Sequence, residues 1–276
     1  MKFGAHVSIA GGVQNAPKNA VDIGCEVFQM FTRSPQGGPA PELTPDVVQA
    51  FHEACEEHKQ EAWYIHTPYY INLASGEARI RHNSVRIIRE ELERGSLLGA
   101  MAVMTHLGSA KDMGEEQAFD VVLEGVKNIL DGYTGKTKFL MEISAGAGMV
   151  IGDTFEELGK IVRATHGKAG ICFDTQHAFA SGYDLRTNES VAAVAKEFGE
   201  KIGFEHLYAS HCNDSMVDFA SHKDRHEHIG KGKIGKEGFY ALFANPHFGK
   251  INYLLETEPG GVKEDLKILK AIRASL

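Results

Sequence analysis

The stretch that decides the fold is AVMTHLGSAKDMGEEQAFDVVLEGVKNILDGYTGKTKFLMEI, residues 102–143. It holds a short apolar run, Ala102–His106, then an amphipathic stretch, Glu115–Leu130, and then a second apolar run, Phe139–Ile143. Short apolar runs with β-branched or aromatic residues predict strands, and apolar residues that recur every three or four positions predict a helix. A strand, a helix and a strand in direct succession predict two parallel strands joined by a crossover helix.

The same alternation of short apolar runs and helical stretches continues in both directions along the chain. Strands are expected at Lys2–Val7, Glu26–Thr32, Ala62–His66, Ala102–His106, Phe139–Ile143, Gly170–Asp174, His206–Ser210 and Ile251–Glu256. Helices are expected, for example, at Thr44–His58, Ala78–Leu98, Glu115–Leu130, Thr154–Thr165, Asn188–Lys201 and Lys263–Ser275. Eight such pairs without a break in composition predict an α/β protein, a single (β/α)8 TIM barrel with residues 1–276 as one catalytic domain. The alternative is an open, doubly wound sheet, but no G-x-G-x-x-G follows the first strand, and Gly11–Gly12 alone is weak evidence.

The composition sets limits on the class of protein. Apolar residues make up 43% of the 276 residues and charged residues 24%, which suffices for a sizeable core and argues against disorder. The formal net charge of −8 argues against a generally basic nucleic-acid coat protein but not against a local basic patch. The four cysteines are scattered without C-x-x-C spacing, as in reduced intracellular proteins. The sequence shows no targeting segment and no apolar run of membrane length, so we expect a cytoplasmic protein that binds no membrane.

Imidazole and carboxylate side chains gather at the expected carboxyl ends of the strands. In a barrel of this kind those ends meet at one face, where the site of such enzymes lies. The candidates are His66, His106, Glu142, Asp174, His177, His211, Asp224, His226 and Glu256. Glu142 and Glu256 are the sharpest signals, because an ionised carboxylate inside an apolar run is costly unless it is paired or bound to metal. An arginine or lysine partner is the alternative, but none stands at a neighbouring strand end.

Each remaining candidate has another explanation when it is taken singly. Asp174 is placed to cap the turn that follows it, and His66 and His106 fit core histidines bonded to backbone carbonyls. Asp224 and His226 lie in SHCNDSMVDFASHKDRHEHIGKGKIG, residues 210–235, which also fits a solvated, charged loop.

Taken together, nine candidates on one rim are too many for one ion. At about three to four protein ligands per zinc, they fit two or three metals. The mixture of nitrogen and oxygen donors favours Zn²⁺, with Mn²⁺ as the alternative at an oxygen-rich position. Close divalent cations generate hydroxide from water at neutral pH and neutralise an attacked phosphate. The residues therefore predict metal-dependent phosphoester hydrolysis.

Positive charge is concentrated in one part of this acidic chain. Lys223, Arg225, Lys231 and Lys233 lie between residues 222 and 235, against two acidic residues, one of which is a candidate ligand. Such a segment is suited to DNA phosphates, and the alternative is a flexible, solvated loop. Asp214 is expected beside the ligands, as a residue that orients them, and His6, at the end of the first strand, fits either such a role or a place in the pocket.

Eight short motifs run from the first expected strand to the last. They are AHVSIAGG (5–12), HTPYYINL (66–73), HLGS (106–109), EISAGAG (142–148), FDTQHAFASGYDLR (173–186), HCNDS (211–215), DRHEHIGKGKIG (224–235) and LETEPG (255–260). Together they resemble the endonuclease IV family of apurinic/apyrimidinic endonucleases, in the xylose isomerase-like TIM-barrel superfamily. The resemblance implies base excision repair of double-stranded DNA by hydrolysis 5′ to an abasic site, which leaves a 3′-hydroxyl and a 5′-deoxyribose phosphate. It also implies removal of 3′ blocking groups.

The resemblance further implies three zinc ions held by named residues. His66, His106 and Glu142 would hold the first, with Glu142 bridging to a second that Asp174, His211 and Glu256 complete. His177, Asp224 and His226 would hold the third. Glu142 would also orient the attacking water.

The DNA-facing loops follow the family's pattern only in part. Tyr69 matches a tyrosine that the family places against DNA, and Tyr70 or Ile71 is a candidate for insertion beside it. Gln36 stands where relatives can carry an inserting arginine, so Arg33 or a different loop is expected to substitute for it. A monomer suffices for one cut in one strand.

The competing class of protein is a metal-dependent sugar isomerase or epimerase of the same superfamily, whose metal sites are richer in oxygen ligands. A third class is a binding protein that has lost catalysis.

Overall fold

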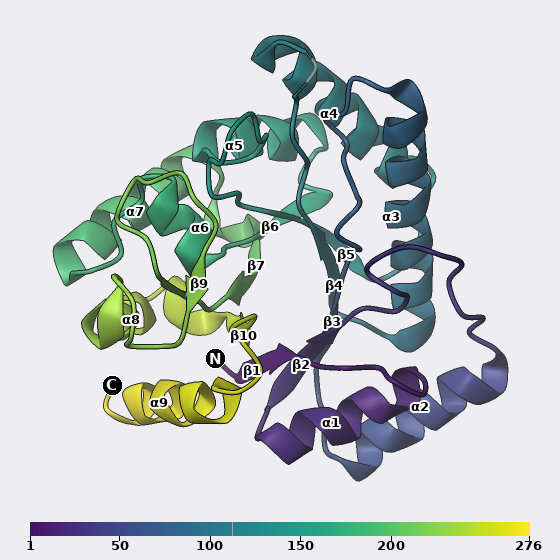
Figure 1. Ribbon diagram of the computed structural model, residues 1–276, viewed down its shortest axis with the longest axis horizontal. Helices are drawn as coiled ribbons and strands as arrows, with labels where there is room; N and C mark the ends of the chain where they lie inside the picture. Colours follow the sequence, from purple (N-terminus) through teal and green to yellow (C-terminus); the bar gives the residue numbers. More distant parts are fainter. Residues whose placement is uncertain (112) are drawn as a thin grey trace.

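The computed structural model describes residues 1–111 and 113–276, and it forms a closed barrel of eight parallel strands (Figure 1). The strands are β1 (Phe3–His6), β2 (Val27–Met30), β3 (Trp63–His66), β4 (Ala102–Thr105), β5 (Lys138–Glu142), β6 (Ala169–Cys172), β7 (Leu207–His211) and β10 (Asn252–Leu255). Their order around the barrel is β1-β10-β7-β6-β5-β4-β3-β2, and β1 pairs with both β2 and β10. This closure confirms the predicted TIM barrel and rules out the open, doubly wound alternative.

Helices surround the barrel on its outside (Figure 1). They are α1 (Ala16–Ile23), α2 (Pro45–Glu57), α3 (Ala78–Leu98), α4 (Glu115–Leu130), α5 (Phe155–Ala164), α6 (Thr175–Ala180), α7 (Asn188–Lys201), α8 (Gly235–Ala244) and α9 (Val262–Ala274). The bounds of α3, α4 and α7 are those predicted, and α2, α5 and α9 differ from the prediction by one residue at each end. Among the described residues, no helix combines the length and apolarity that crossing a bilayer requires.

Short elements complete the chain between the barrel helices. They are the 3₁₀ helices η1 (Val13–Asn15), η2 (Phe204–His206) and η3 (Phe248–Lys250), and the hairpin strands β8 (Asp214–Ser215) and β9 (His226–Glu227). No bounds were predicted for α1, α6, α8 or this hairpin. The hairpin matters for the site because it gives a defined structure to a segment that, from sequence, also fits a solvated, charged loop.

The stretch 102–143 folds as its residue pattern predicts. β4 and β5 pair in parallel along their length. Between them, α4 buries Val122, Val126 and Ile129 on one face. Its first turn is acidic and Lys127 lies in its last turn, so the charges complement the helix dipole at both ends.

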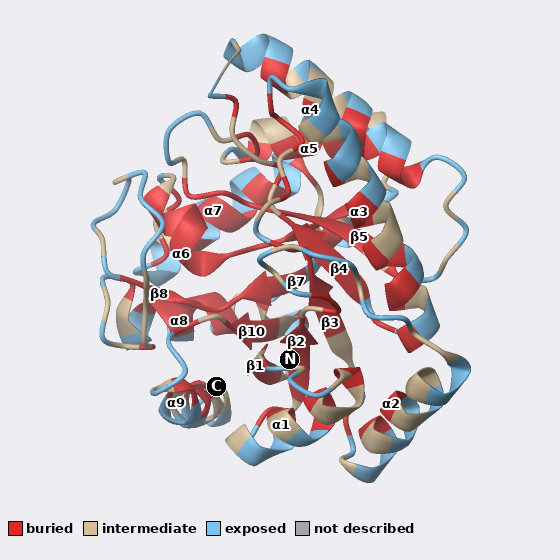
Figure 2. Ribbon diagram, turned by 45° about the vertical axis from the view of Figure 1, so that its right-hand side comes forward, coloured by how far each residue is buried: buried red, intermediate tan, exposed pale blue. Residues whose placement is uncertain are grey.

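The side chains of each strand alternate between the inside of the barrel and the layer beneath the helices. The inward-facing apolar cluster consists of Val27, Tyr64, Ala102, Met104, Leu140, Cys172, Ala209 and Leu254, and Gly4 takes the matching place in β1. On each strand, the residue two positions after the last of these also faces inward. The eight residues at these positions form what we call the strand-end ring. The ring consists of His6, Gln29, His66, His106, Glu142, Asp174, His211 and Glu256. Figure 2 shows the strands as the buried centre of the molecule and the outer helix faces as exposed.

Candidate metal centre

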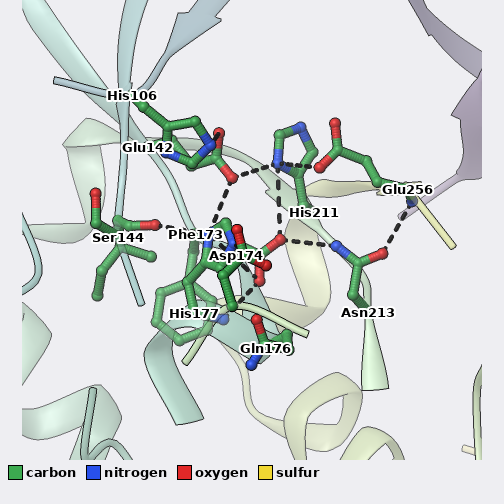
Figure 3. Close-up of polar contacts among 12 residues, drawn as sticks. His106, Glu142, Ser144, Phe173, Asp174, Gln176, His177, His211, Asn213 and Glu256 are labelled. Atoms are coloured by element: carbon green, nitrogen blue, oxygen red, sulfur yellow. Dashed lines mark hydrogen bonds and ion pairs between the residues drawn. The ribbon is translucent and has the colours of Figure 1, made fainter. Parts of the chain in front are cut away.

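Glu142 is the centre of the strand-end ring. Its side chain is fully buried, and the Oε2 atom lies 3.1 Å from His66 Nε2 and 3.4 Å from His106 Nε2. The Oε1 atom lies 2.8 Å from His211 Nδ1 and 3.2 Å from His177 Nδ1. Figure 3 shows His106, His177 and His211 around Glu142. Each carboxylate oxygen therefore faces a different pair of imidazoles, which is the arrangement of a bridging ligand.

A second convergence lies on the far side of Glu142. Ligand atoms of Glu142, Asp174, His211 and Glu256 all lie within 4.8 Å of one another. His211 Nδ1 is 3.3 Å from Glu256 Oε2 and 3.8 Å from Asp174 Oδ2 (Figure 3). Three carboxylates and one imidazole surround one point. They supply the negative charge and the nitrogen donor that suit a divalent cation of borderline softness.

A third convergence lies nearer the surface and includes the hairpin. His226 Nε2 in β9 is 3.3 Å from His177 Nε2 in α6. Asp224 Oδ1 lies 3.4 Å from His177 Nε2 and 3.5 Å from His226 Nε2. The hairpin thus places Asp224 and His226 over α6, where they meet a residue from a different strand end. Asp174, His177 and His226 also form one compact set of potential ligand atoms.

Backbone carbonyls fix which nitrogen two of the imidazoles present. His66 Nδ1 lies 2.7 Å from the carbonyl oxygen of Thr67, and His177 Nδ1 lies 3.0 Å from that of Ile143. A carbonyl oxygen only accepts, so both Nδ1 atoms carry a hydrogen, and Nε2 is the nitrogen that each imidazole presents to the cluster. For His177 this argues for the set with His226 rather than for a set through Nδ1 with Glu142.

Neighbouring imidazoles lower the pKa values of the carboxyl groups of Glu142 and Asp224. Burial alone would raise the pKa of Glu142, but the charges of His106 and His211 hold that pKa well below its usual range. Burial is likewise outweighed at Asp224, where the hydrogen bond and charge of His177 lower the pKa to about 2. The pKa values of His177 and His211 are in turn raised well above the usual value by neighbouring charges, against the effect of burial. Entry of a cation would release these protons, as metal binding to imidazole requires.

Two further residues contact the candidate ligands, and no role was predicted for either. Asn213 donates from Nδ2 to Asp174 Oδ2 at 2.7 Å and accepts the backbone N–H of Glu256 at 2.9 Å (Figure 3). Gln29, buried in β2, contacts His211 and Glu256. Asn213 is part of the HCNDS motif, and Gln29 could be found from sequence as the inward-facing residue at the end of the second strand.

Asp214 organises the basic segment rather than contacting the cluster directly. Its fully buried carboxylate accepts the backbone N–H groups of Gly230, Gly232, Ile234 and Gly235. A Cβ atom on Gly232 would lie 2.5 Å from Asp214 Oδ1, so only glycine allows this approach. One carboxylate therefore shapes the loop that carries Lys231 and Lys233.

The change Asp214→Asn is expected to lower the free energy of unfolding by about 2–3 kcal/mol. The new NH2 group would face backbone donors that now share a carboxylate, so at least one N–H would lose its acceptor inside the fold. Urea unfolding measures the loss. Asp218→Asn is the matched control, because the Asp218 side chain is 86% exposed and its ion pair with Lys233 lies at the surface. Equal stabilities of the two variants would contradict this role for Asp214.

The residues expected to contact DNA lie in different environments. Tyr69 is 75% exposed and its ring packs edge-on against Phe31, and Tyr70 beside it is half-buried. The basic residues Lys223, Arg225, Lys231 and Lys233 are all exposed.

Arg33 is placed differently from the expectation. Its side chain is 3% exposed and its guanidinium pairs with the fully buried carboxylate of Glu91 in α3 and with Glu90. A buried and paired guanidinium is not presented to a DNA duplex, so Arg33 ties the loop after β2 to α3. The insertion assigned to it from sequence therefore does not fit this placement.

A cavity of about 500 Å³ opens beside the cluster. Its wall includes His106, His177 and Asp224 from the cluster and Tyr69 and Tyr70 from the loop after β3. A group bound there would touch the candidate ligands and the exposed aromatic side chains at the same time.

Comparison with known proteins identifies the family. The model of the family described as "Xylose isomerase-like TIM barrel" matches residues 17–272. A "Probable endonuclease 4" of Carboxydothermus hydrogenoformans is 40% identical over 274 residues, 99% of this chain and 96% of the relative. Another, of Aquifex aeolicus, is 40% identical over 257 residues, 92% of this chain and 91% of the relative. The crystal structure of endonuclease IV from Thermus thermophilus superposes with a TM-score of 0.89 at 31% identity and full coverage of both chains. A D-tagatose 3-epimerase-like protein, with a TM-score of 0.75 at 20% identity, shares the fold. The chain belongs to the endonuclease IV family of xylose isomerase-like TIM barrels.

Proposed function

We propose that this protein is a zinc-dependent DNA repair endonuclease that hydrolyses the phosphodiester bond 5′ to an abasic site, leaving a 3′-hydroxyl and a 5′-deoxyribose phosphate. The observation that carries the proposal is the convergence of five imidazoles and four carboxylates, with buried Glu142 at their centre, next to a cavity. The relatives named endonuclease 4 span nearly the whole chain and support the choice of DNA as substrate.

The nine residues are divided among three zinc ions in this proposal, with Mn²⁺ as the alternative at one of them. The first set is His66, His106 and Glu142; the second is Glu142, Asp174, His211 and Glu256; the third is His177, Asp224 and His226. Support comes from the two oxygens of the Glu142 carboxylate, which face different imidazoles, and from the Nε2 atoms that His66 and His177 present to the cluster. Divalent cations at such a site activate water and neutralise charge on the phosphate and the leaving oxygen. Glu142, between the first two sets, orients the attacking water.

DNA is held at the rim of the barrel. Lys223, Arg225, Lys231 and Lys233 contact phosphates, so the local charge attracts DNA although the total charge is −8. Exposed Tyr69 stacks at the damaged site, with Tyr70 beside it. An abasic nucleotide is the easiest to extrude because it has no base to unstack, and the cavity beside the cluster receives it. Removal of 3′ blocking groups at the same centre, a monomer of one catalytic domain and a cytoplasmic location complete the proposal.

The test is incision of a duplex that carries one tetrahydrofuran abasic analogue, with an intact duplex as control. The analogue blocks lyase chemistry, so a cut must be hydrolytic. Zinc-loaded protein is expected to cut only 5′ to the analogue, to lose this activity after chelation and to regain it with zinc. A zinc-loaded protein that leaves the duplex whole and interconverts ketose and aldose sugars would replace this proposal with the isomerase class.

The double change Lys231→Ala and Lys233→Ala is expected to weaken binding to abasic duplex and to intact duplex alike. Two lost phosphate contacts lower the slope of log K against log salt concentration by about 2. Fluorescence anisotropy over a range of salt concentrations measures the slope. Lys196→Ala with Lys267→Ala is the matched control, since both lysines are exposed on outer helices, α7 and α9. A slope that is unchanged in the Lys231 and Lys233 variant would remove this loop from the DNA interface.

A further inference from the structure

Gln29 is the one amide in the strand-end ring, whose other seven members are imidazoles or carboxylates. It lies in β2, fully buried, and reaches His211 at the end of β7 and Glu256 just after β10. Its Oε1 atom is 2.7 Å from His211 Nε2, and its Nε2 atom is 2.7 Å from Glu256 Oε1 and 3.0 Å from His6 Nδ1. All the hydrogen-bonding groups of the amide therefore face another member of the ring.

The partners determine which way the amide points. An ionised carboxylate only accepts hydrogen bonds, so the atom that faces Glu256 must be the NH2 group of Gln29. The oxygen then faces His211 Nε2, and because this oxygen can only accept, Nε2 of His211 must carry a hydrogen. The orientation of the amide thus follows from the chemistry of its partners.

The protonated Nε2 of His211 leaves Nδ1 as the nitrogen that can bind a cation. This atom lies 2.8 Å from Glu142 Oε1 and 3.3 Å from Glu256 Oε2. His211 therefore presents the opposite nitrogen from His66 and His177, which present Nε2. The same amide that fixes the tautomer of His211 also holds the outer oxygen of Glu256, so the other oxygen turns toward His211.

We propose that Gln29 is a positioning residue for the cation held by Glu142, Asp174, His211 and Glu256, through one amide that sets the His211 tautomer and aims Glu256. The inference rests on the proposed function, because it assumes that this set binds a metal. Partners of this kind behind metal ligands affect affinity by about 10–100-fold. Loss of the amide is therefore expected to weaken one metal position and to leave the other two unchanged.

The test compares Gln29→Met with Gln29→Glu. Methionine has nearly the volume of glutamine but neither its donor nor its acceptor, whereas glutamate keeps an acceptor for His211 Nε2 and places a second carboxylate against Glu256. Gln60→Met is the matched control, because Gln60 is a buried glutamine that precedes β3, at the other end of the barrel. Zinc per chain is measured at a series of buffered free-zinc concentrations. Long-range ¹H–¹⁵N spectra of the imidazoles, recorded on zinc-loaded protein, report the tautomers.

In Gln29→Met, one zinc ion is expected to bind about 10–100-fold more weakly than in the wild type, and the Nε2–H, Nδ1-bound signal of His211 is expected to be lost. In Gln29→Glu the same ion binds more weakly but the His211 signal remains. Gln60→Met should match the wild type in both measurements. Wild-type zinc affinity and an unchanged His211 signal in Gln29→Met would overturn the proposal. Should Gln29→Met not fold, Gln29→Glu decides alone, and wild-type zinc affinity in that variant would overturn it.

The outcome is separate from that of the proposed function. A wild-type protein that binds zinc but leaves the abasic duplex intact would contradict the nuclease, while zinc occupancy and the imidazole spectra would still test Gln29. A nuclease that is active with Gln29→Met at full zinc occupancy would contradict the positioning role alone.

Discussion

Replacement of Glu142 by glutamine is expected to lower kcat for incision at an abasic site on the order of 10³-fold, with a folded protein. Both Glu142 oxygens face imidazoles, on opposite sides, and the side chain is fully buried. A neutral amide offers one oxygen instead of two, so one of the two adjoining metal sets loses a ligand. The bridge between the sets is lost as well. Single-turnover incision with excess protein measures the chemical step, and zinc per chain is determined on the same samples.

Glu91→Gln is the matched control for this prediction. Glu91 is equally buried, but its partners are Arg33 and the hydroxyl of Thr32, away from the cluster. Its replacement is expected to reduce stability while zinc content and kcat remain near those of the wild type. If Glu142→Gln kept its full zinc content and cut within about tenfold of the wild-type rate, Glu142 would not be a bridging ligand.

The period of two along the strands explains why most of the candidate site can be predicted from sequence. Each strand of a barrel turns alternate residues inward, so one inward position at each carboxyl end forms a ring. Six of the eight ring members are among the nine candidate ligands from the sequence. His6 stayed undecided between a ligand-orienting and a pocket role, and its place in the ring next to Gln29 supports the former. Gln29 was not predicted, because the period of two gives its inward-facing position at the strand end but a single amide there indicates no chemical role until its partners are known.

Asp174 and His66 each combine, in the structure, the two roles that the sequence presents as alternatives. Asp174 caps α6, since its Oδ1 accepts the backbone N–H of His177 at 2.7 Å, while Oδ2 faces His211. His66 donates to a backbone carbonyl, as a core histidine does, while Nε2 faces Glu142. Side chains with two polar atoms serve the backbone with one and the cluster with the other, so a local pattern cannot choose between the two roles.

Other features depend on partners that are distant in sequence. Arg33 follows a strand and reads as a surface residue, but Glu91 buries and pairs it from α3, 58 residues away. α6 has six residues, too few for a helical period to be visible. The hairpin of β8 and β9 pairs two residues with two, and its shape is fixed by the buried carboxylate of Asp214 rather than by strand propensity. Patterns in the local sequence do not include these partners, so they could not predict the placement of Arg33 or the shape of the hairpin.

Removal of bound zinc is expected to abolish incision and to lower the melting temperature of the wild-type protein by about 5–10 °C for each ion lost. A ligand present at about 100 times its Kd adds about 2.7 kcal/mol to the free energy of unfolding, and 1 kcal/mol corresponds to about 2–4 °C for a chain of roughly this length. Loss of zinc is expected to affect stability as well as catalysis. Without the cations, four carboxylates and five imidazoles remain close together and lose the positive charge that balances the carboxylates. Calorimetry of stripped and zinc-restored protein measures the shift, with a zinc-saturated chelator as the control for effects of the chelator itself. A stripped protein that melts at the temperature of the zinc-loaded one, with zinc absent by elemental analysis, would show that the cluster is held by its own hydrogen bonds and that the cations contribute only to the chemistry.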